Sequence, residues 1–291
     1  MDQLHESRAD EPDEVLRARL GEHGYLFLRD LLDEEVRAGA LALVELLREG
    51  GWVAEDGRAL PPAGTAQQEQ DPVYRAAVRS PHFHRVPYAP ALHDLVRRLL
   101  QEDVFTYPSK VLRATPPASW TTEAGRYAHQ DYSYWGVEDM LTTWVPFMPV
   151  PTRLGGLAVR PGSHRGGPVP LVPIGDDTSG WASTDYRLGD VIVFHCLTAH
   201  AALPNRTDGL RVSGDFRWQP VTSPVKREFL HGRSGRTTEM FSTSLSREPW
   251  WRPVPAGVPV RTGEWDVHAP PRGSRFFEVG PAWSSWRGPE G

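Results

Sequence analysis

The stretch from residue 104 to residue 220 alternates between short strand-like segments and turn signals, and this pattern restricts the fold more than any other feature of the chain. The strand-like segments are 104–114, 125–133, 140–149, 155–160, 186–195 and 210–219. Turns between them are indicated by Pro116-Pro117, Gly155-Gly156, Pro161-Gly162 and Asp208-Gly209. Many short strands separated by turns predict that this part is a sandwich or a barrel.

Helical patterns precede the strand-rich part. Apolar residues recur at helical spacing in the segments 15–20, 36–47 and 92–100, and a short apolar strand is predicted at 25–28. Residues 1–12 are charged and poor in apolar residues, so they are predicted to be a disordered tail.

The order of these patterns predicts an α+β, mostly-β fold in one domain. That domain spans residues 13–291, with a helical part at 13–103 and a barrel at 104–220. Residues 221–291 form a C-terminal extension that is rich in Trp and Pro. No composition shift typical of a linker separates the parts.

Composition excludes several classes of protein. The chain has 32 Lys and Arg against 37 Asp and Glu, a formal net charge of −5, so we expect no nucleic-acid partner. It has no run of eighteen apolar residues, so we expect no membrane span. The acidic start has no apolar signal core, and the expected location is cytoplasmic. Its single cysteine, Cys196, is predicted to serve packing.

The motif His129-Gln130-Asp131 is the first sign of a chemical site. On a strand, residues two apart point to the same face, so the imidazole and the carboxylate would aim at one point. With a third His they would make the facial triad that binds Fe(II) and leaves coordination positions open. A lone His-x-Asp arises readily by chance, so the motif needs independent support.

A second candidate region follows at residues 190–218. A buried-looking strand at 190–195 leads to His200, and residues 211–218 alternate strictly. Arg211, Ser213, Asp215 and Arg217 face one way on that strand; Val212, Gly214, Phe216 and Trp218 face the other. Such a polar row is either a solvated face or the lining of a barrel lumen.

Taken in order, these pieces resemble the phytanoyl-CoA dioxygenase family of Fe(II)/2-oxoglutarate oxygenases. The resemblance covers residues 20–220 and implies a double-stranded β-helix core of the jelly-roll or cupin-like type, with flanking N-terminal helices. The matching pieces are His129-Gln130-Asp131, Pro161-Gly162-Ser163-His164-Arg165, the strand from Gly189-Asp190, His200, Asn205 and Arg211.

The resemblance implies that His129, Asp131 and His200 are the catalytic centre and the ligands of Fe(II), with O2 reacting beside them. His195 is the rival for the distal ligand, but His200 has the family's spacing of eleven residues to Arg211. Because Asp131 is retained, where related halogenases have a small residue, the resemblance implies hydroxylation or another C–H oxidation that yields succinate and CO2.

The resemblance also implies a binding site for the cosubstrate 2-oxoglutarate. Arg211 would bind its far carboxylate, and Thr142 would donate a hydrogen bond to the same group. Lys110 is predicted to contact cosubstrate or substrate, although a surface lysine lying along apolar groups is the plainer alternative.

The predicted partner is a small-molecule substrate, handled by a monomer or homodimer. The sequence after Asp131 is similar to that of bacterial hydroxylases of proline and ectoine, which implies an amino-acid-like substrate. The predicted substrate-binding residues are Gln130, Tyr132, Tyr134, Trp135 and Arg217, with Arg113 as another partner for a carboxylate.

Other functions stay open on the sequence alone. The aromatic residues after Asp131 could be ordinary packing, and a larger secondary metabolite fits as well as a small zwitterion. A non-catalytic β-helix protein that binds a ligand and a cupin-like metalloenzyme without 2-oxoglutarate are further alternatives. Retention of all three ligands and Arg211 argues against the first, and retention of Arg211 argues against the second.

Overall fold

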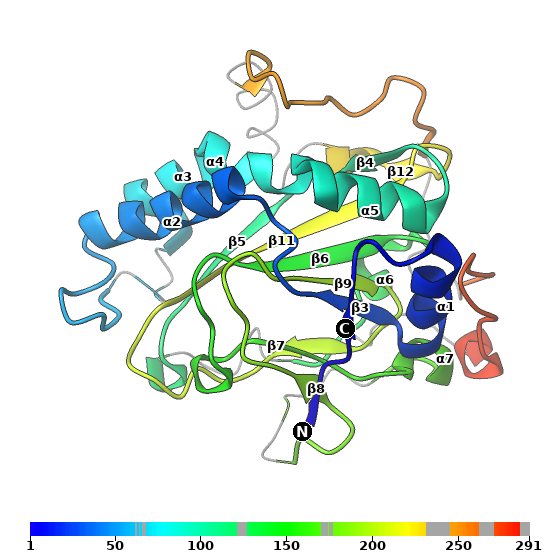
Figure 1. Cartoon of the computed structure of the whole chain (residues 1–291), viewed down its shortest axis with the longest axis horizontal. Helices are drawn as coiled ribbons and strands as arrows, with labels where there is room; N and C mark the ends of the chain where they lie inside the picture. Colours follow the sequence, from blue (N-terminus) through cyan, green and yellow to red (C-terminus); the bar gives the residue numbers. More distant parts are fainter. Residues whose placement is uncertain are drawn as a thin grey trace.

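The computed structural model describes residues 1–285 except 62, 64, 66–67, 121–126, 170–173, 175–176, 231–244 and 262–270. Helices, a large sheet and a smaller sheet form three successive layers (Figure 1). The helical layer over the large sheet consists of α2 (Glu34–Glu49), α3 (Pro72–Arg79), α4 (Pro81–Arg85) and α5 (Pro90–Leu100). At one end of the sheets lie α1 (Asp13–His23), α6 (Tyr132–Trp135) and α7 (Ser163–Gly166).

The two main sheets are mostly antiparallel. In order, the large sheet is β2 (Glu6–Ser7), β3 (Tyr25–Leu28), β9 (Val191–His195), β6 (Leu141–Pro146), β11 (Arg211–Pro220) and β4 (Val104–Thr106), with β5 (Val111–Thr115) also paired to β11. The smaller sheet is β1 (Asp2–Gln3), β8 (Ala182–Ser183), β7 (Leu157–Val159) and β10 (His200–Ala202). Strands β12 (Val225–Lys226) and β13 (Val260–Arg261) form a separate pair. This architecture confirms the predicted mostly-β fold with N-terminal helices.

Strand β11 separates two apolar clusters and is buried along its whole length. Phe216 points to the helical layer and packs against Phe83 of α4, with ring centroids 5.4 Å apart. On the other side, Trp144 of β6 joins Tyr186 in the second cluster, at 4.7 Å between ring centroids. The polar row of β11 therefore lies inside the barrel, which decides between the two readings left open by the sequence.

The prediction of a disordered tail at residues 1–12 is wrong. Asp2 and Gln3 pair in parallel with β8, and Glu6 and Ser7 pair in parallel with β3. These pairings satisfy backbone groups at the edges of both sheets, which composition alone does not reveal.

Two short helices, α3 and α4, were not predicted. Each begins with a proline after a capping side chain: Asp71 accepts from the amides of Val73 and Tyr74, and Ser80 accepts from that of His82. The sequence did carry this start signal, because Asp-Pro and Ser-Pro place a cap directly before a proline at the first helical position.

Gly24 joins the end of α1 to the loop between β9 and β10. It adopts a φ of 82°, and its carbonyl accepts from the His195 amide at 3.0 Å and the Thr198 hydroxyl at 2.7 Å. A Cβ at this position would lie 2.4 Å from Nδ1 of His164 and 2.5 Å from Oγ1 of Thr198. Only glycine therefore fits this turn, which is hydrogen-bonded to the segment that leads to His200.

Replacing Gly24 by alanine is expected to lower the free energy of unfolding by about 2 kcal/mol or more, from left-handed strain plus overpacking. Gly51 is the matched control, because its φ is 79° and a Cβ there would meet no atom within 4 Å. G51A should show only the backbone cost, about 1–2 kcal/mol. Equal losses for the two variants in chemical denaturation would contradict the steric argument.

Candidate active site

His129 and His200 are brought together by backbone pairing. They form an antiparallel bridge in which the His129 amide donates to the His200 carbonyl at 3.1 Å and the reverse bond measures 2.9 Å. Their ring centroids lie 4.2 Å apart. Residues distant in the sequence are thus held side by side by two hydrogen bonds.

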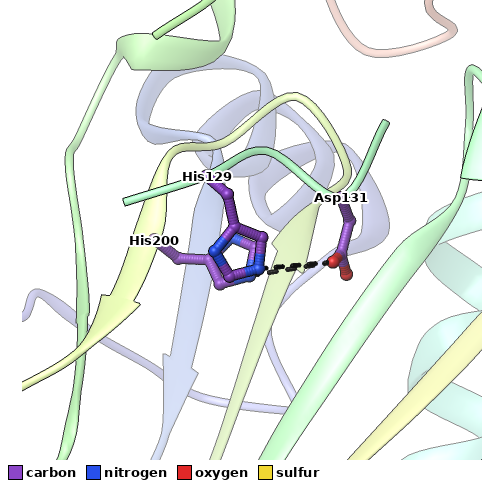
Figure 2. A group of neighbouring side chains, drawn as sticks. All are labelled: His129, Asp131 and His200. Carbon is purple, nitrogen blue, oxygen red and sulfur yellow. Dashed lines mark ion pairs between the residues drawn. The ribbon is translucent and has the colours of Figure 1, made fainter. Parts of the chain in front are cut away.

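Asp131 completes the cluster, although not from a strand. The prediction of a strand over 125–133 is wrong in its described part: beyond the bridge at His129, the chain turns into α6, with Asp131 as the residue before its first turn. Figure 2 shows the Asp131 carboxylate facing both imidazoles. Its Oδ1 lies 3.9 Å from Nε2 of His129 and 3.8 Å from Nε2 of His200. One ligand atom from each residue lies within 4.8 Å of the others.

Hydrogen bonds orient both imidazoles for metal binding. Nδ1 of His129 lies 2.9 Å from the carbonyl of Tyr127, and Nδ1 of His200 lies 3.0 Å from that of Thr198. Because a carbonyl only accepts, each Nδ1 carries the proton and each Nε2 presents a lone pair to the common point. Burial and the neighbouring His129 lower the pKa of His200 to about 3, which keeps that ring neutral.

The carboxylate of Asp131 is held ionised. Its burial opposes ionisation, but Arg217, the two histidines and the Thr142 hydroxyl outweigh this and hold its pKa well below the usual range. Two neutral imidazoles and one carboxylate are the ligand set that suits Fe(II) and leaves coordination positions for other molecules. The residues present therefore fit a mononuclear iron site.

Arg211 has the properties of an anion-binding residue. It is 1% exposed, and one of its amino groups donates to Thr115 at 2.7 Å. Its Nε and other amino group are buried without a partner among the described residues, as is the hydroxyl of Ser213 on the same face of β11. Burial, then the nearby Arg113, lowers its pKa to about 10, so it is charged at neutral pH. Unpaired buried donors on a cation fit a carboxylate such as that of 2-oxoglutarate.

Thr142 and Arg217 both contact Asp131. The Thr142 hydroxyl donates to Oδ2 at 2.6 Å, where a contact to the cosubstrate carboxylate was expected. Nε of Arg217 donates to the same oxygen at 3.1 Å, where a contact to substrate was expected. Both side chains thus lie at the site but are engaged with the predicted iron ligand.

Two of the other predicted binding residues, Gln130 and Tyr132, are buried and packed against protein. The Gln130 amide nitrogen donates to the carbonyls of Gly167 and Leu197, and its oxygen accepts from the Val169 amide, so this side chain links several loops. Tyr132 is buried against Trp283.

Tyr134 and Trp135 lie next to the cluster, whereas Lys110 has aromatic neighbours of its own. Tyr134 is 49% exposed and lies edge-on to His129, and Trp135 lies under the Arg217 guanidinium. The ammonium of Lys110 lies about 5.8 Å from the ring of Tyr88 and 5.7 Å from that of Trp251.

His195 does not join the metal cluster. It is fully buried and lies 3.8 Å from Asp139 and 3.3 Å from the Ser274 hydroxyl. His164 of α7 does not join it either: it is buried, with Nε2 2.9 Å from the Gly21 carbonyl.

Sequence reasoning assigned no functional role to several polar groups of the lumen. Trp144 pairs in register with Asp215, and both carry a buried polar atom without a described partner: Nε1 of the indole and Oδ1 of the carboxylate. Ser213 belongs to the same row. The strict alternation of residues 211–218 places Ser213 and Asp215 on the same face as Arg211. Their position in the lumen follows once that face is known to point inward.

Comparisons with known proteins show which family the chain belongs to. The family model for phytanoyl-CoA dioxygenase matches residues 20–213. A 1-deoxypentalenic acid 11-beta-hydroxylase of Streptomyces exfoliatus is 31% identical over 240 residues, or 72% of this chain and 82% of the relative. The protein of the same name from Streptomyces arenae is 30% identical over the same shares.

Solved structures share the fold. The alpha-ketoglutarate-dependent epimerase SnoN from nogalamycin biosynthesis superposes with a TM-score of 0.55 at 21% identity, over 92% of this chain and 98% of its own. EctD from S. alaskensis, solved with 2-oxoglutarate and 5-hydroxyectoine, gives 0.53 at 23% identity, over 90% and 91%. Among the described helices, none combines the length and apolar character needed to span a bilayer. The chain belongs to the phytanoyl-CoA dioxygenase family and is a dioxygenase with a double-stranded β-helix core.

Proposed function

We propose that this dioxygenase hydroxylates a C–H bond of a natural-product intermediate, using Fe(II), 2-oxoglutarate and O2 and releasing succinate and CO2. The observation that carries the proposal is the match at 31% identity, over most of both chains, to a hydroxylase named for 1-deoxypentalenic acid. The preorganised His129, Asp131 and His200 cluster supports the iron chemistry.

Each part of the site has a distinct task. His129, Asp131 and His200 would hold the metal, because their ligand atoms converge on one point. Bound iron would supply the activation of O2 that an unreactive C–H bond requires. Arg211 and Ser213 orient the cosubstrate through its carboxylate.

The charges of the lumen favour a substrate with a carboxylate. Arg217 is engaged with Asp131 and its side chain is 7% exposed, whereas that of Arg113 is 38% exposed. Arg113 is therefore the lumen arginine that a substrate reaches most easily, even while it pairs with Asp215 at 2.6 Å. A carboxylic acid such as 1-deoxypentalenic acid, for which both relatives are named, fits this arrangement, and a zwitterionic amino acid is the second candidate.

A substrate screen tests the proposal. Purified enzyme with Fe(II), 2-oxoglutarate and O2 is offered 1-deoxypentalenic acid and other carboxylic acids without an amino group in one panel, and proline, ectoine and similar zwitterions in another. We expect the acids to raise succinate release above the substrate-free rate and to gain one oxygen atom by mass spectrometry. Stimulation by the zwitterions alone would contradict the substrate class, and no stimulation by either panel would contradict the proposal.

We also propose a cytoplasmic location and a monomeric or homodimeric state. The absence of a second cysteine in the sequence supports a reducing compartment, where disulfides are rare. Cell fractionation and light scattering of the purified protein test the two statements.

A further inference from the structure

We propose that Arg217 is a positioning residue of the metal site: it directs one chosen oxygen of Asp131 to the metal and ties this ligand to Trp135. The inference concerns how the chain prepares its carboxylate ligand. It rests on the iron site of the proposed function, and its test reads metal affinity without any substrate.

The two oxygens of Asp131 have different surroundings. Oδ1 faces both imidazoles, at 3.9 and 3.8 Å from their Nε2 atoms. Oδ2 accepts from Thr142 at 2.6 Å and from Nε of Arg217 at 3.1 Å, and an amino group of Arg217 reaches Oδ1 at 3.3 Å. A carboxylate offers about four lone-pair positions, so these three donors leave one, on Oδ1. Asp131 is therefore prepared to bind metal through a single oxygen.

The donors come from facing positions of one sheet. Arg217 of β11 and Thr142 of β6 are register partners in the antiparallel ladder. Their side chains therefore lie next to each other on the face of the sheet that contacts Asp131. The side chains of Arg217 and Asp131 are 7% and 1% exposed. Removal of the guanidinium would leave a buried carboxylate short of donors and free to rotate or to bind through both oxygens.

Arg217 also contacts the far end of the same helical turn. Its guanidinium carbon lies 4.9 Å from the centroid of the Trp135 ring, within range of a cation–π interaction. The Trp135 amide donates to the Asp131 carbonyl at 3.1 Å, which closes one helical turn between these two residues. Arg217 therefore contacts the side chains at both ends of this turn. Trp135 packs against Phe229 at 4.3 Å and Tyr107 at 4.9 Å between ring centroids. The position of the metal ligand is thereby coupled to an aromatic cluster next to the site.

The test compares Fe(II) affinities of Arg217→Gln, Arg217→Lys and the matched control Arg113→Gln. Arg113 is an arginine of the same lumen that pairs with Asp215 and touches none of the three predicted ligands. Affinity is measured without oxygen, from the absorbance of the Fe(II)–2-oxoglutarate complex and from the rise in melting temperature on adding Fe(II) or Mn(II) alone.

We expect R217Q to weaken Fe(II) binding by roughly 10- to 100-fold, the usual cost of losing a group that orients a metal ligand. R217K should recover part of this loss, because it restores one donor but not the paired contact. R113Q should bind Fe(II) as the wild type does, whatever its effect on substrate. T142V, which removes the other donor to Oδ2, should weaken binding in the same direction.

An unchanged Fe(II) affinity in R217Q, with a raised KM for substrate, would overturn the inference and make Arg217 a substrate-binding residue. If R217Q does not fold by circular dichroism, R217K and T142V are judged by the same criterion: wild-type affinity in both refutes the proposal. Failure of the wild type itself to bind Fe(II) would instead refute the proposed function.

Discussion

Replacing Asp131 by alanine is expected to abolish both Fe(II) binding and 2-oxoglutarate-dependent succinate formation. The substitution removes one of three converging ligands and leaves Arg217 buried without its carboxylate. The loss of metal affinity should exceed the roughly 10- to 100-fold that loss of a supporting partner costs. Asp131→Asn keeps the volume and one accepting oxygen, so it separates loss of the anionic ligand from loss of packing.

The control for this result is His195→Gln. His195 is a buried histidine near the end of β9 that contacts Asp139 and Ser274 outside the cluster. H195Q should lose some stability but still bind Fe(II) in an anaerobic titration. Near-wild-type succinate formation by D131A, or loss of metal binding in H195Q with a folded protein, would assign the metal to another site.

Replacing Arg211 by alanine is expected to raise the KM for 2-oxoglutarate by roughly thirty-fold or more. Truncation of one partner of a buried, hydrogen-bonded charge pair costs about 2–5 kcal/mol. Arg211 is a buried guanidinium whose Nε and one amino group have no hydrogen-bond partner among the described residues, so these donors and the positive charge are available to a carboxylate. R211K should recover only part of the affinity, because an ammonium cannot make the same paired contact.

Two measurements make this prediction specific. The rise in melting temperature that 2-oxoglutarate causes in the wild type should disappear in R211A, while Fe(II) alone still stabilises the variant. R113Q should keep the wild-type KM for 2-oxoglutarate, since the buried donors without a described partner belong to Arg211 and not to Arg113. If the KM for 2-oxoglutarate rose in R113Q and stayed at the wild-type value in R211A, Arg113 rather than Arg211 would be the residue that binds the cosubstrate.

The long elements of the fold could be predicted from local pattern. Helices α1, α2 and α5 and strands β6, β9 and β11 lie in segments for which the local sequence predicts a helix or a strand, and the structure confirms them. Strands β1 and β2 consist of two residues each, and their formation depends on edges supplied by β8 and β3. No local pattern marks such strands, because their hydrogen-bond partners lie elsewhere in the chain.

The sequence by itself determined which residues are available for the chemistry and in what order they occur: His129 and Asp131, then His200, then Arg211 at the start of an alternating strand. Tertiary structure decided which way that strand faces, because burial depends on the sheet opposite. It also decided that His200 rather than His195 meets His129, through a pair of backbone hydrogen bonds. Arg217 and Thr142 contact Asp131 for the same reason: strand register places donors from β11 and β6 beneath a carboxylate that the turn into α6 delivers.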